Sequence, residues 1–138
     1  MHDTNTGIKS KIFKLTIMAN KKTLVLGASA NPSRYSNLAV NSLAAKGHDV
    51  IAVGRREGKI GNTPITTEQR EITNLDTITL YLNAQNQKNY YDYIIAQKPK
   101  RIIFNPGAEN DELADLAKKA GILTQEACTL VLLSTGQY

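Results

Sequence analysis

Short apolar segments alternate with longer segments of helical spacing, and this alternation constrains the fold more than any other feature of the chain. Four apolar or β-branched runs are typical of buried strands, and they span residues 23–27, 49–53, 77–82 and 101–104. Apolar residues at helical spacing predict helices over residues 35–46, 84–98 and 111–120. The connections are too long for hairpins, so the strands should run parallel and be joined by right-handed crossovers. We therefore predict an α/β fold, a Rossmann-like, doubly wound, mainly parallel sheet with helices on both faces.

The remaining segments carry weaker signals. Residues 122–124 and 130–133 are apolar enough to complete the sheet as strands. Residues 54–69 are rich in glycine and predict a loop, with room for a short strand near Ile60 or Ile65.

The length of 138 residues suits one domain rather than two. Residues 1–20 have a weak pattern, and Met18 lies shortly before the first clear strand. We therefore expect a flexible N-terminal extension over residues 1–20 and a single domain over residues 21–138.

Several classes of protein are disfavoured by composition. No window approaches the roughly 18 consecutive apolar residues of a membrane span. Cys128 is the single cysteine, so no internal disulfide is expected, and a reducing cytoplasm fits. His2 and His48 have no grouped partners, which argues against a metal site.

The net charge of +5 is compatible with nucleic acid, an anionic membrane or a small polyanionic ligand. The basic residues are spread along the chain in pairs, without the aromatic-flanked basic runs that single-strand binders use for stacking. Nucleic acid and membranes are therefore not the expected partners. A solvated basic surface or a small anionic ligand accounts for the charge.

Doubly wound sheets bind ligands at the carboxyl ends of their strands, so the loops after the strands are the candidate sites. The first loop spans residues 27–36. Gly27 permits a tight turn and close approach of a ligand to the backbone, and Ala28 and Ser29 are small for the same reason. Free amides at the start of the following helix favour an anion. Arg34 adds a bidentate donor for phosphate.

This first loop departs from the dinucleotide fingerprint G-x-G-x-x-G, because Ser29 and Pro32 stand at its second and third glycine positions. A purely structural interpretation remains open. In it, Asn31 and Pro32 form a turn, and Ser33 or Ser36 caps the helix.

The second loop contains Val53, Gly54, Arg55 and Arg56. Enzymes that use NAD often place an acidic residue here to bond the ribose hydroxyls. Two arginines favour a phosphate on the ribose instead, which both NADP and coenzyme A carry. A solvated pair of charges is the alternative.

The third loop begins with Asn105, Pro106 and Gly107. Acidic residues follow within residues 109–112, where they suit the helix dipole but would repel a pyrophosphate. We therefore expect this loop to contact a neutral part of a ligand, such as an adenine edge or a pantetheine amide.

Taken in order, four motifs resemble those of the small coenzyme A-binding domain proteins, stand-alone relatives of the first domain of the succinyl-CoA synthetase alpha subunit. They are Gly27-Ala28-Ser29-x-Asn31-Pro32-x-Arg34-Tyr35-Ser36, Gly47-His48-x-Val50, Ile60-Gly61-x-x-Pro64 and Asn105-Pro106-Gly107-Ala108-Glu109-Asn110. The resemblance covers residues 22–128. It implies that Gly27, Ala28, Ser29, Arg34, Tyr35 and Ser36 serve the diphosphate, and that Val53, Gly54, Arg55 and Arg56 serve the adenosine and its phosphate.

Two departures from the family pattern concern the same edge of the sheet. The family often carries Asn-Pro where this chain has Gly54-Arg55, and an arginine where it has Leu82-Asn83. Either change would weaken coenzyme binding or alter the preferred ligand.

The function expected from this resemblance is non-catalytic binding of coenzyme A or an acyl-CoA. A synthetase of this superfamily needs a phosphate-carrying histidine, but His48 is expected to be a surface or packing residue and Cys128 a core or strand-edge thiol. An NADP-dependent oxidoreductase domain and a partner-interaction domain that has lost its ligand remain as alternatives. The candidate ligand-binding residues are Gly27, Ala28, Ser29, Asn31, Arg34, Tyr35, Ser36, Val53, Gly54, Arg55, Arg56, Asn105, Pro106 and Gly107, with none catalytic and none metal-binding.

Overall fold

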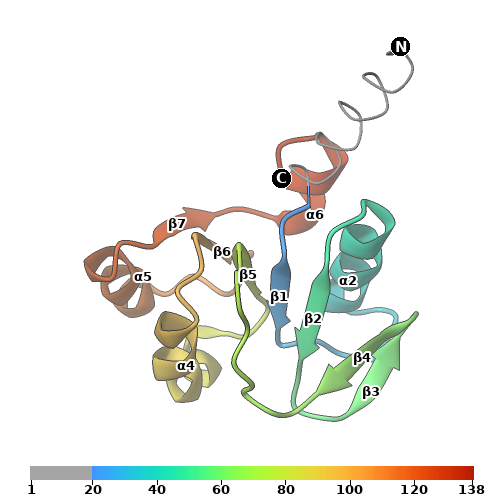
Figure 1. Cartoon of the computed structure of the whole chain (residues 1–138), viewed down its shortest axis with the longest axis horizontal. Helices are drawn as coiled ribbons and strands as arrows, with labels where there is room; N and C mark the ends of the chain where they lie inside the picture. Colours follow the sequence, from blue (N-terminus) through green and yellow to red (C-terminus); the bar gives the residue numbers. More distant parts are fainter. Residues whose placement is uncertain (1–19) are drawn as a thin grey trace, which may run out of the picture.

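The computed structural model describes residues 20–138, which form a seven-stranded sheet in the order β3-β4-β2-β1-β5-β6-β7 (Figure 1). Every neighbouring pair is parallel except β3 and β4, which form an antiparallel hairpin. The strands are β1 Thr23–Leu26, β2 Val50–Val53, β3 Gly58–Ile60, β4 Thr63–Thr66, β5 Thr77–Leu80, β6 Arg101–Phe104 and β7 Leu123–Glu126. The predicted Rossmann-like α/β fold is confirmed.

The helices are α2 Tyr35–Ala45, α3 Ala84–Gln87, α4 Tyr91–Ala96, α5 Asp111–Lys119 and α6 Thr129–Ser134, with a 3₁₀ turn over Lys88–Tyr90. Helices α2 and α6 lie together on one face of the sheet, and α4 and α5 cover the other (Figure 1). None of these helices is long and apolar enough to cross a membrane. The predicted extension over residues 1–20 lies outside the described residues, apart from Asn20.

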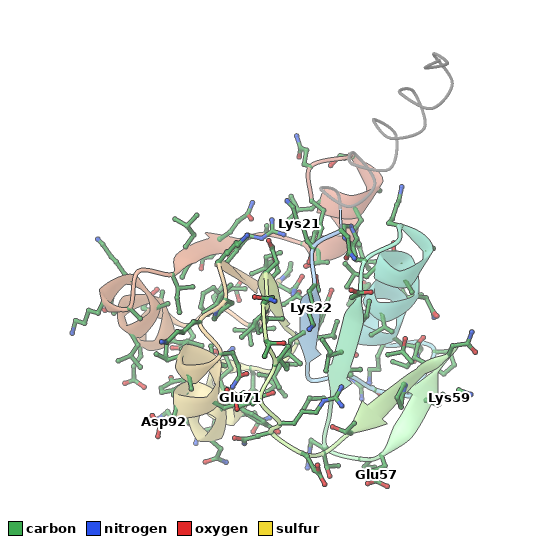
Figure 2. All side chains as sticks on the ribbon, in the orientation of Figure 1. Lys21, Lys22, Glu57, Lys59, Glu71 and Asp92 are labelled. Atoms are coloured by element: carbon green, nitrogen blue, oxygen red, sulfur yellow. The ribbon has the colours of Figure 1, made fainter. Side chains whose placement is uncertain are left out.

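Alternating side chains of the strands divide the core into two layers, as the two-residue period of a strand requires. Leu24 and Leu26 of β1 pack toward α4 and α5, whereas Val25 packs toward α2 and α6. Charged side chains such as Lys59 and Asp92 project outward from this core (Figure 2).

Two predicted elements are corrected by the structure. The predicted strand over residues 130–133 is wrong, because the segment forms α6. Thr129, Leu132 and Leu133 are buried and Val131 is exposed, which is the spacing of a helix face. A four-residue apolar run does not distinguish a strand from a short buried helix. The last strand is β7, which confirms the strand predicted over residues 122–124 and extends it to Glu126, with all four residues exposed at the edge of the sheet.

The predicted helix over residues 84–98 is divided into α3, the 3₁₀ turn and α4. Gln87 ends α3, and its side chain is fully buried. Its amide donates to the carbonyls of Leu82 at 2.8 Å and Ala108 at 2.7 Å. This buried amide ties the loop after β5 to the loop after β6, and both loops reach the site described next.

Candidate functional site

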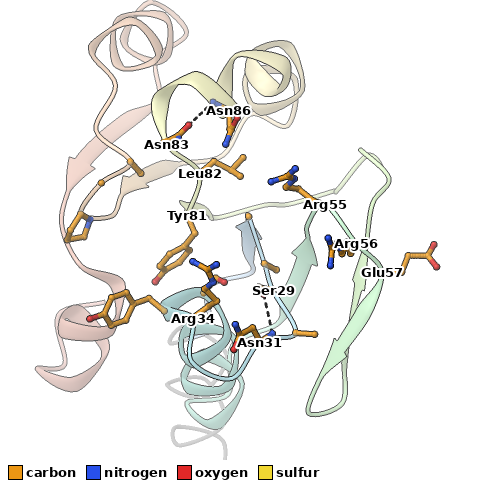
Figure 3. Close-up of a pocket in the computed structure, with 18 residues that line it drawn as sticks. Ser29, Asn31, Arg34, Arg55, Arg56, Glu57, Tyr81, Leu82, Asn83 and Asn86 are labelled. Atoms are coloured by element: carbon orange, nitrogen blue, oxygen red, sulfur yellow. Dashed lines mark hydrogen bonds between the residues drawn. The ribbon is translucent and has the colours of Figure 1, made fainter.

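Strand β1 lies between β2 and β5 in the sheet, so the chain winds away from β1 in opposite directions on its two sides. The carboxyl ends of β1 and β5 are therefore the topological switch point, where such folds bind ligands. A pocket of about 790 Å³ opens at this point and is lined by the loops after β1, β2, β5 and β6 (Figure 3). Its volume is within the range of small-molecule sites.

Most of the predicted ligand-binding residues meet in this pocket. Those that line it are Gly27, Ala28, Ser29, Asn31, Arg34, Tyr35, Ser36, Arg55, Arg56, Pro106 and Gly107. The parallel sheet brings together segments that are distant in sequence, because the carboxyl ends of parallel strands share one edge.

Three predicted residues do not line the pocket. Val53 is fully buried in the core at the end of β2. Gly54 is buried against the backbone of Ala28. Asn105 is buried and donates to the Thr79 hydroxyl at 2.7 Å and the Leu80 carbonyl at 2.9 Å, while its side-chain oxygen accepts from the Thr129 amide. All three hold the loops around the pocket in place.

The loop after β1 has a left-handed turn at its first residue. Gly27 has a φ of +97°, and a β-carbon there would lie 2.9 Å from the carbonyl carbon of Tyr81. The amides of Gly27 and Ala28 both donate to the Val53 carbonyl, at 2.9 and 3.0 Å. This turn therefore requires glycine, and it leaves bare backbone at the floor of the pocket.

Helix α2 begins beside this loop without a side-chain cap and without an acidic residue in its first turn. The alternative in which Ser33 or Ser36 caps the helix is therefore wrong, although Asn31 does form a turn by accepting from the Ser33 amide at 3.0 Å. Helix α5 differs, because Asn110 caps it and Asp111 follows in its first turn. An anion is favoured at α2 and disfavoured at α5.

Positive charge gathers on one half of the pocket. Arg34 precedes α2, and Arg55 and Arg56 follow β2, all three exposed at the lining. Glu57 also lines this half, but its carboxylate points away from Arg56 (Figure 3). The half of the pocket above β1 and β2 is therefore cationic.

The other half of the pocket lies above β5 and β6 and carries no charged side chain. It is lined by Tyr81, Leu82, Asn83, Asn86, Pro106, Gly107 and Ala108. The Asn83 side chain caps α3 by accepting from the Asn86 amide at 2.9 Å (Figure 3). This half offers amides, a phenol ring and apolar surface to a ligand.

Several lining residues were not among the predicted set. They are Ala30, Glu57, Tyr81, Leu82, Asn83, Asn86 and Ala108. A strand predicted over residues 77–82 leaves Tyr81 inside the sheet, whereas β5 ends at Leu80 and the loop begins at Tyr81. Leu82 and Asn83 are noted in the sequence only as a departure from the family pattern, and the switch-point rule applied to a strand that ends at Leu80 adds Tyr81.

The chain's single cysteine and its described histidine lie outside this lining. His48 precedes β2 at the opposite edge of the sheet, where its ring packs on Tyr138 at 5.1 Å between centroids. Cys128 is half-buried at the start of α6. Within residues 20–138, no group of three His, Cys, Asp or Glu side chains is arranged to hold a metal ion.

A family model described as a CoA binding domain matches residues 21–134, which is nearly the whole described chain. The chain belongs to this CoA-binding domain family. The resemblance drawn from the loop motifs is therefore confirmed at the level of the family.

Solved structures agree with this assignment. A protein described only as uncharacterized is 48% identical, with a TM-score of 0.85 over 87% of this chain and 99% of that chain. A hypothetical protein from Pyrococcus horikoshii OT3 is 20% identical, with a TM-score of 0.77 over 91% of this chain and 89% of that chain. A protein from Thermus thermophilus is 17% identical, with a TM-score of 0.75 over 93% of this chain and 98% of that chain. The last two support the fold alone. No curated protein matches the chain significantly.

Proposed function

We propose that the chain binds coenzyme A or an acyl-CoA in this pocket and acts as a non-catalytic, cytoplasmic module. The observation that carries the proposal is the division of the pocket into a cationic half and an uncharged half. Coenzyme A has the same division, since its phosphates lie at one end and its amide-containing pantetheine arm at the other. Membership of the CoA-binding domain family supports the same ligand.

The cationic half suits the phosphates of the ligand. The uncapped start of α2, with Arg34 beside it, would hold the diphosphate through backbone amides and a guanidinium. Gly27 lets the loop after β1 pack closely against the backbone of Tyr81, which holds the two halves of the pocket together. Arg55 or Arg56, just beyond β2, would hold the phosphate on the adenosine ribose.

The composition of the lining supports a binding role. The lining contains no histidine, cysteine, lysine or aspartate, and its acidic residue, Glu57, points outward (Figure 3). A nucleophile with an adjacent general base, the usual arrangement for covalent catalysis, is not found among these residues. A module of this kind senses or carries its ligand and leaves it chemically unchanged.

Native mass spectrometry of protein purified from cells tests this proposal. We expect a fraction of the wild-type chain to retain coenzyme A or an acyl-CoA, and we expect Arg34→Glu to lose that fraction because a carboxylate would repel the diphosphate. Lys59→Glu is the matched control, since it makes the same charge change on β3, outside the pocket lining. A retained NADP, or coenzyme A kept equally by both variants, would contradict the proposal.

A further inference from the structure

Tyr81 combines two properties that are rarely found together. Its side chain lines the uncharged half of the pocket, directly after β5. Its hydroxyl oxygen is buried, however, and has no hydrogen-bond partner within residues 20–138. Buried polar groups are nearly always paired, so an unpaired one at a ligand pocket calls for a functional explanation.

The polar groups next to this hydroxyl are already paired with one another. The Thr79 and Thr129 hydroxyls lie beside it and influence its pKa, but neither meets the geometry of a hydrogen bond to it. They are instead 2.8 Å apart and bonded to each other, and Asn105 donates to Thr79 at 2.7 Å. The hydroxyls of Thr79 and Thr129 and the Asn105 amide therefore form a hydrogen-bonded network that does not include Tyr81. The phenol of Tyr81 has no partner in it.

The position of Tyr81 indicates which part of a ligand it would meet. In the sheet, β5 lies between β1, whose loop carries Arg34, and β6, whose loop carries Pro106 and Gly107. Figure 3 shows Tyr81 on the same side of the pocket as Arg34, at the boundary of the cationic half. A ligand with its diphosphate at Arg34 would extend its next, uncharged segment past Tyr81.

We propose that Tyr81 is a specificity-determining residue, whose hydroxyl turns into the pocket and hydrogen-bonds to an amide or thioester carbonyl of the ligand's pantetheine arm. The proposal rests on the proposed function. In this structure the ring packs partly against the core layer that contains Val25 and Val40, so presenting the hydroxyl to a ligand requires the side chain to rotate away from that layer. A phenol, whose ordinary pKa is about 10, stays protonated at neutral pH and can donate to a neutral carbonyl.

The test compares coenzyme A with adenosine 3′,5′-bisphosphate, which keeps part of the nucleotide and lacks the pantetheine arm. We expect Tyr81→Phe to weaken coenzyme A binding about threefold to tenfold, the effect of one net hydrogen bond, and to leave the bisphosphate unchanged. Tyr91→Phe is the matched control, since its hydroxyl bonds to Asn110 outside the lining.

Two further readouts separate a ligand contact from a structural effect. The melting temperature of Tyr81→Phe should equal or exceed that of wild type, because the variant removes an unpaired buried hydroxyl. The chain has no tryptophan, so its fluorescence comes from tyrosine. Coenzyme A should change this emission in wild type and in Tyr91→Phe, and should change it less in Tyr81→Phe.

Each result decides the matter. Selective loss of coenzyme A affinity in a stable Tyr81→Phe protein supports the proposal. Unchanged affinity for both ligands overturns it while the proposed function stands. An equal loss of affinity for coenzyme A and for the bisphosphate also overturns the proposal, because Tyr81 would then affect binding of the nucleotide and not of the pantetheine arm. If wild type binds neither ligand, the proposed function fails, and the role of Tyr81 fails with it.

Discussion

Gly54 packs directly against the carbonyl group of Ala28, at a separation that leaves no room for a β-carbon. This approach joins the loop after β2 to the loop after β1, the two loops that carry the arginines of the pocket. Gly54 was predicted to contact the ligand, but its position after β2 serves to bring these loops together.

Gly54→Ala should therefore destabilise the fold by about 1–3 kcal/mol, because the overlap is with backbone that cannot turn away. It should also weaken coenzyme A binding by displacing Ala28. Urea unfolding followed by circular dichroism measures the first effect. Gly47→Ala is the comparison. A β-carbon at Gly47 would meet open space, but the φ of Gly47 is +85°, which is strained for alanine. That variant should lose some stability and keep its affinity; wild-type stability and affinity in Gly54→Ala would refute the account.

Arg55 and Arg56 should distinguish coenzyme A from 3′-dephospho-coenzyme A. Replacing the arginine that contacts the 3′-phosphate with alanine should weaken binding of the full coenzyme about tenfold, near the lower end for a charge-assisted bond because both side chains are exposed. The dephospho form should be little affected. Calorimetric titrations of both ligands check this, with Lys59→Ala as an exposed control. If Arg55→Ala and Arg56→Ala both bind both ligands with wild-type affinity, the two arginines are only a solvated pair of charges.

Asn105 should prove structural rather than ligand-binding. Asn105→Leu removes three buried hydrogen bonds and should cost about 2–4 kcal/mol, since each unpaired buried group costs about 1–3 kcal/mol. Asn105→Asp keeps the acceptor for the Thr129 amide but buries a carboxylate against the Leu80 carbonyl, so it should be at least as destabilising as Asn105→Leu. Denaturant midpoints for the three proteins measure the order. A fully stable Asn105→Leu protein that binds coenzyme A poorly would restore Asn105 as a ligand contact.

His48 should make stability depend on pH below neutrality. Burial, followed by the charge of Lys21, lowers the pKa of His48 from its ordinary value of 6.5, and the neutral ring accepts from the Lys21 amide at 2.8 Å. The unfolded chain therefore takes up this proton more readily. The stabilisation is complete above pH 6.5 and is lost as the pH falls toward the lower, folded-state pKa.

His48→Asn is the control for this prediction, because asparagine offers an oxygen acceptor and does not titrate. Melting temperatures of both proteins from pH 8 to pH 5 should diverge below about pH 6.5, with wild type falling further. Titration of the other groups contributes to both proteins and cancels in the difference. Parallel melting profiles would show that His48 does not carry the effect.

The four central strands and their parallel, doubly wound character could be predicted from the sequence because each of these strands is a short apolar run that ends near a glycine or an asparagine. The same rule identified residues 27–36 and Arg55 as part of one edge, since parallel strands bring their carboxyl ends together. These predictions needed only the period and the polarity of the chain.

Other features depend on contacts that no local pattern records. Leu132 and Leu133 are buried, and α6 packs against α2. The apolar run over residues 130–133 does not show this packing, so it is equally compatible with a strand. Asn105 looks like a loop residue, and its burial follows from Thr79 and Thr129, each more than 20 residues away. The unpaired hydroxyl of Tyr81 likewise follows from how these neighbours pair with each other.

The most direct test of the account is a calorimetric titration of the wild-type protein with coenzyme A and NADP under the same conditions. Both ligands carry a phosphate on the adenosine ribose, at the 2′ position in NADP and the 3′ position in coenzyme A, so the comparison tests the phosphate position together with the pantetheine arm. The account predicts that coenzyme A binds more tightly, by at least about tenfold. Equal affinities, or tighter binding of NADP, would contradict it.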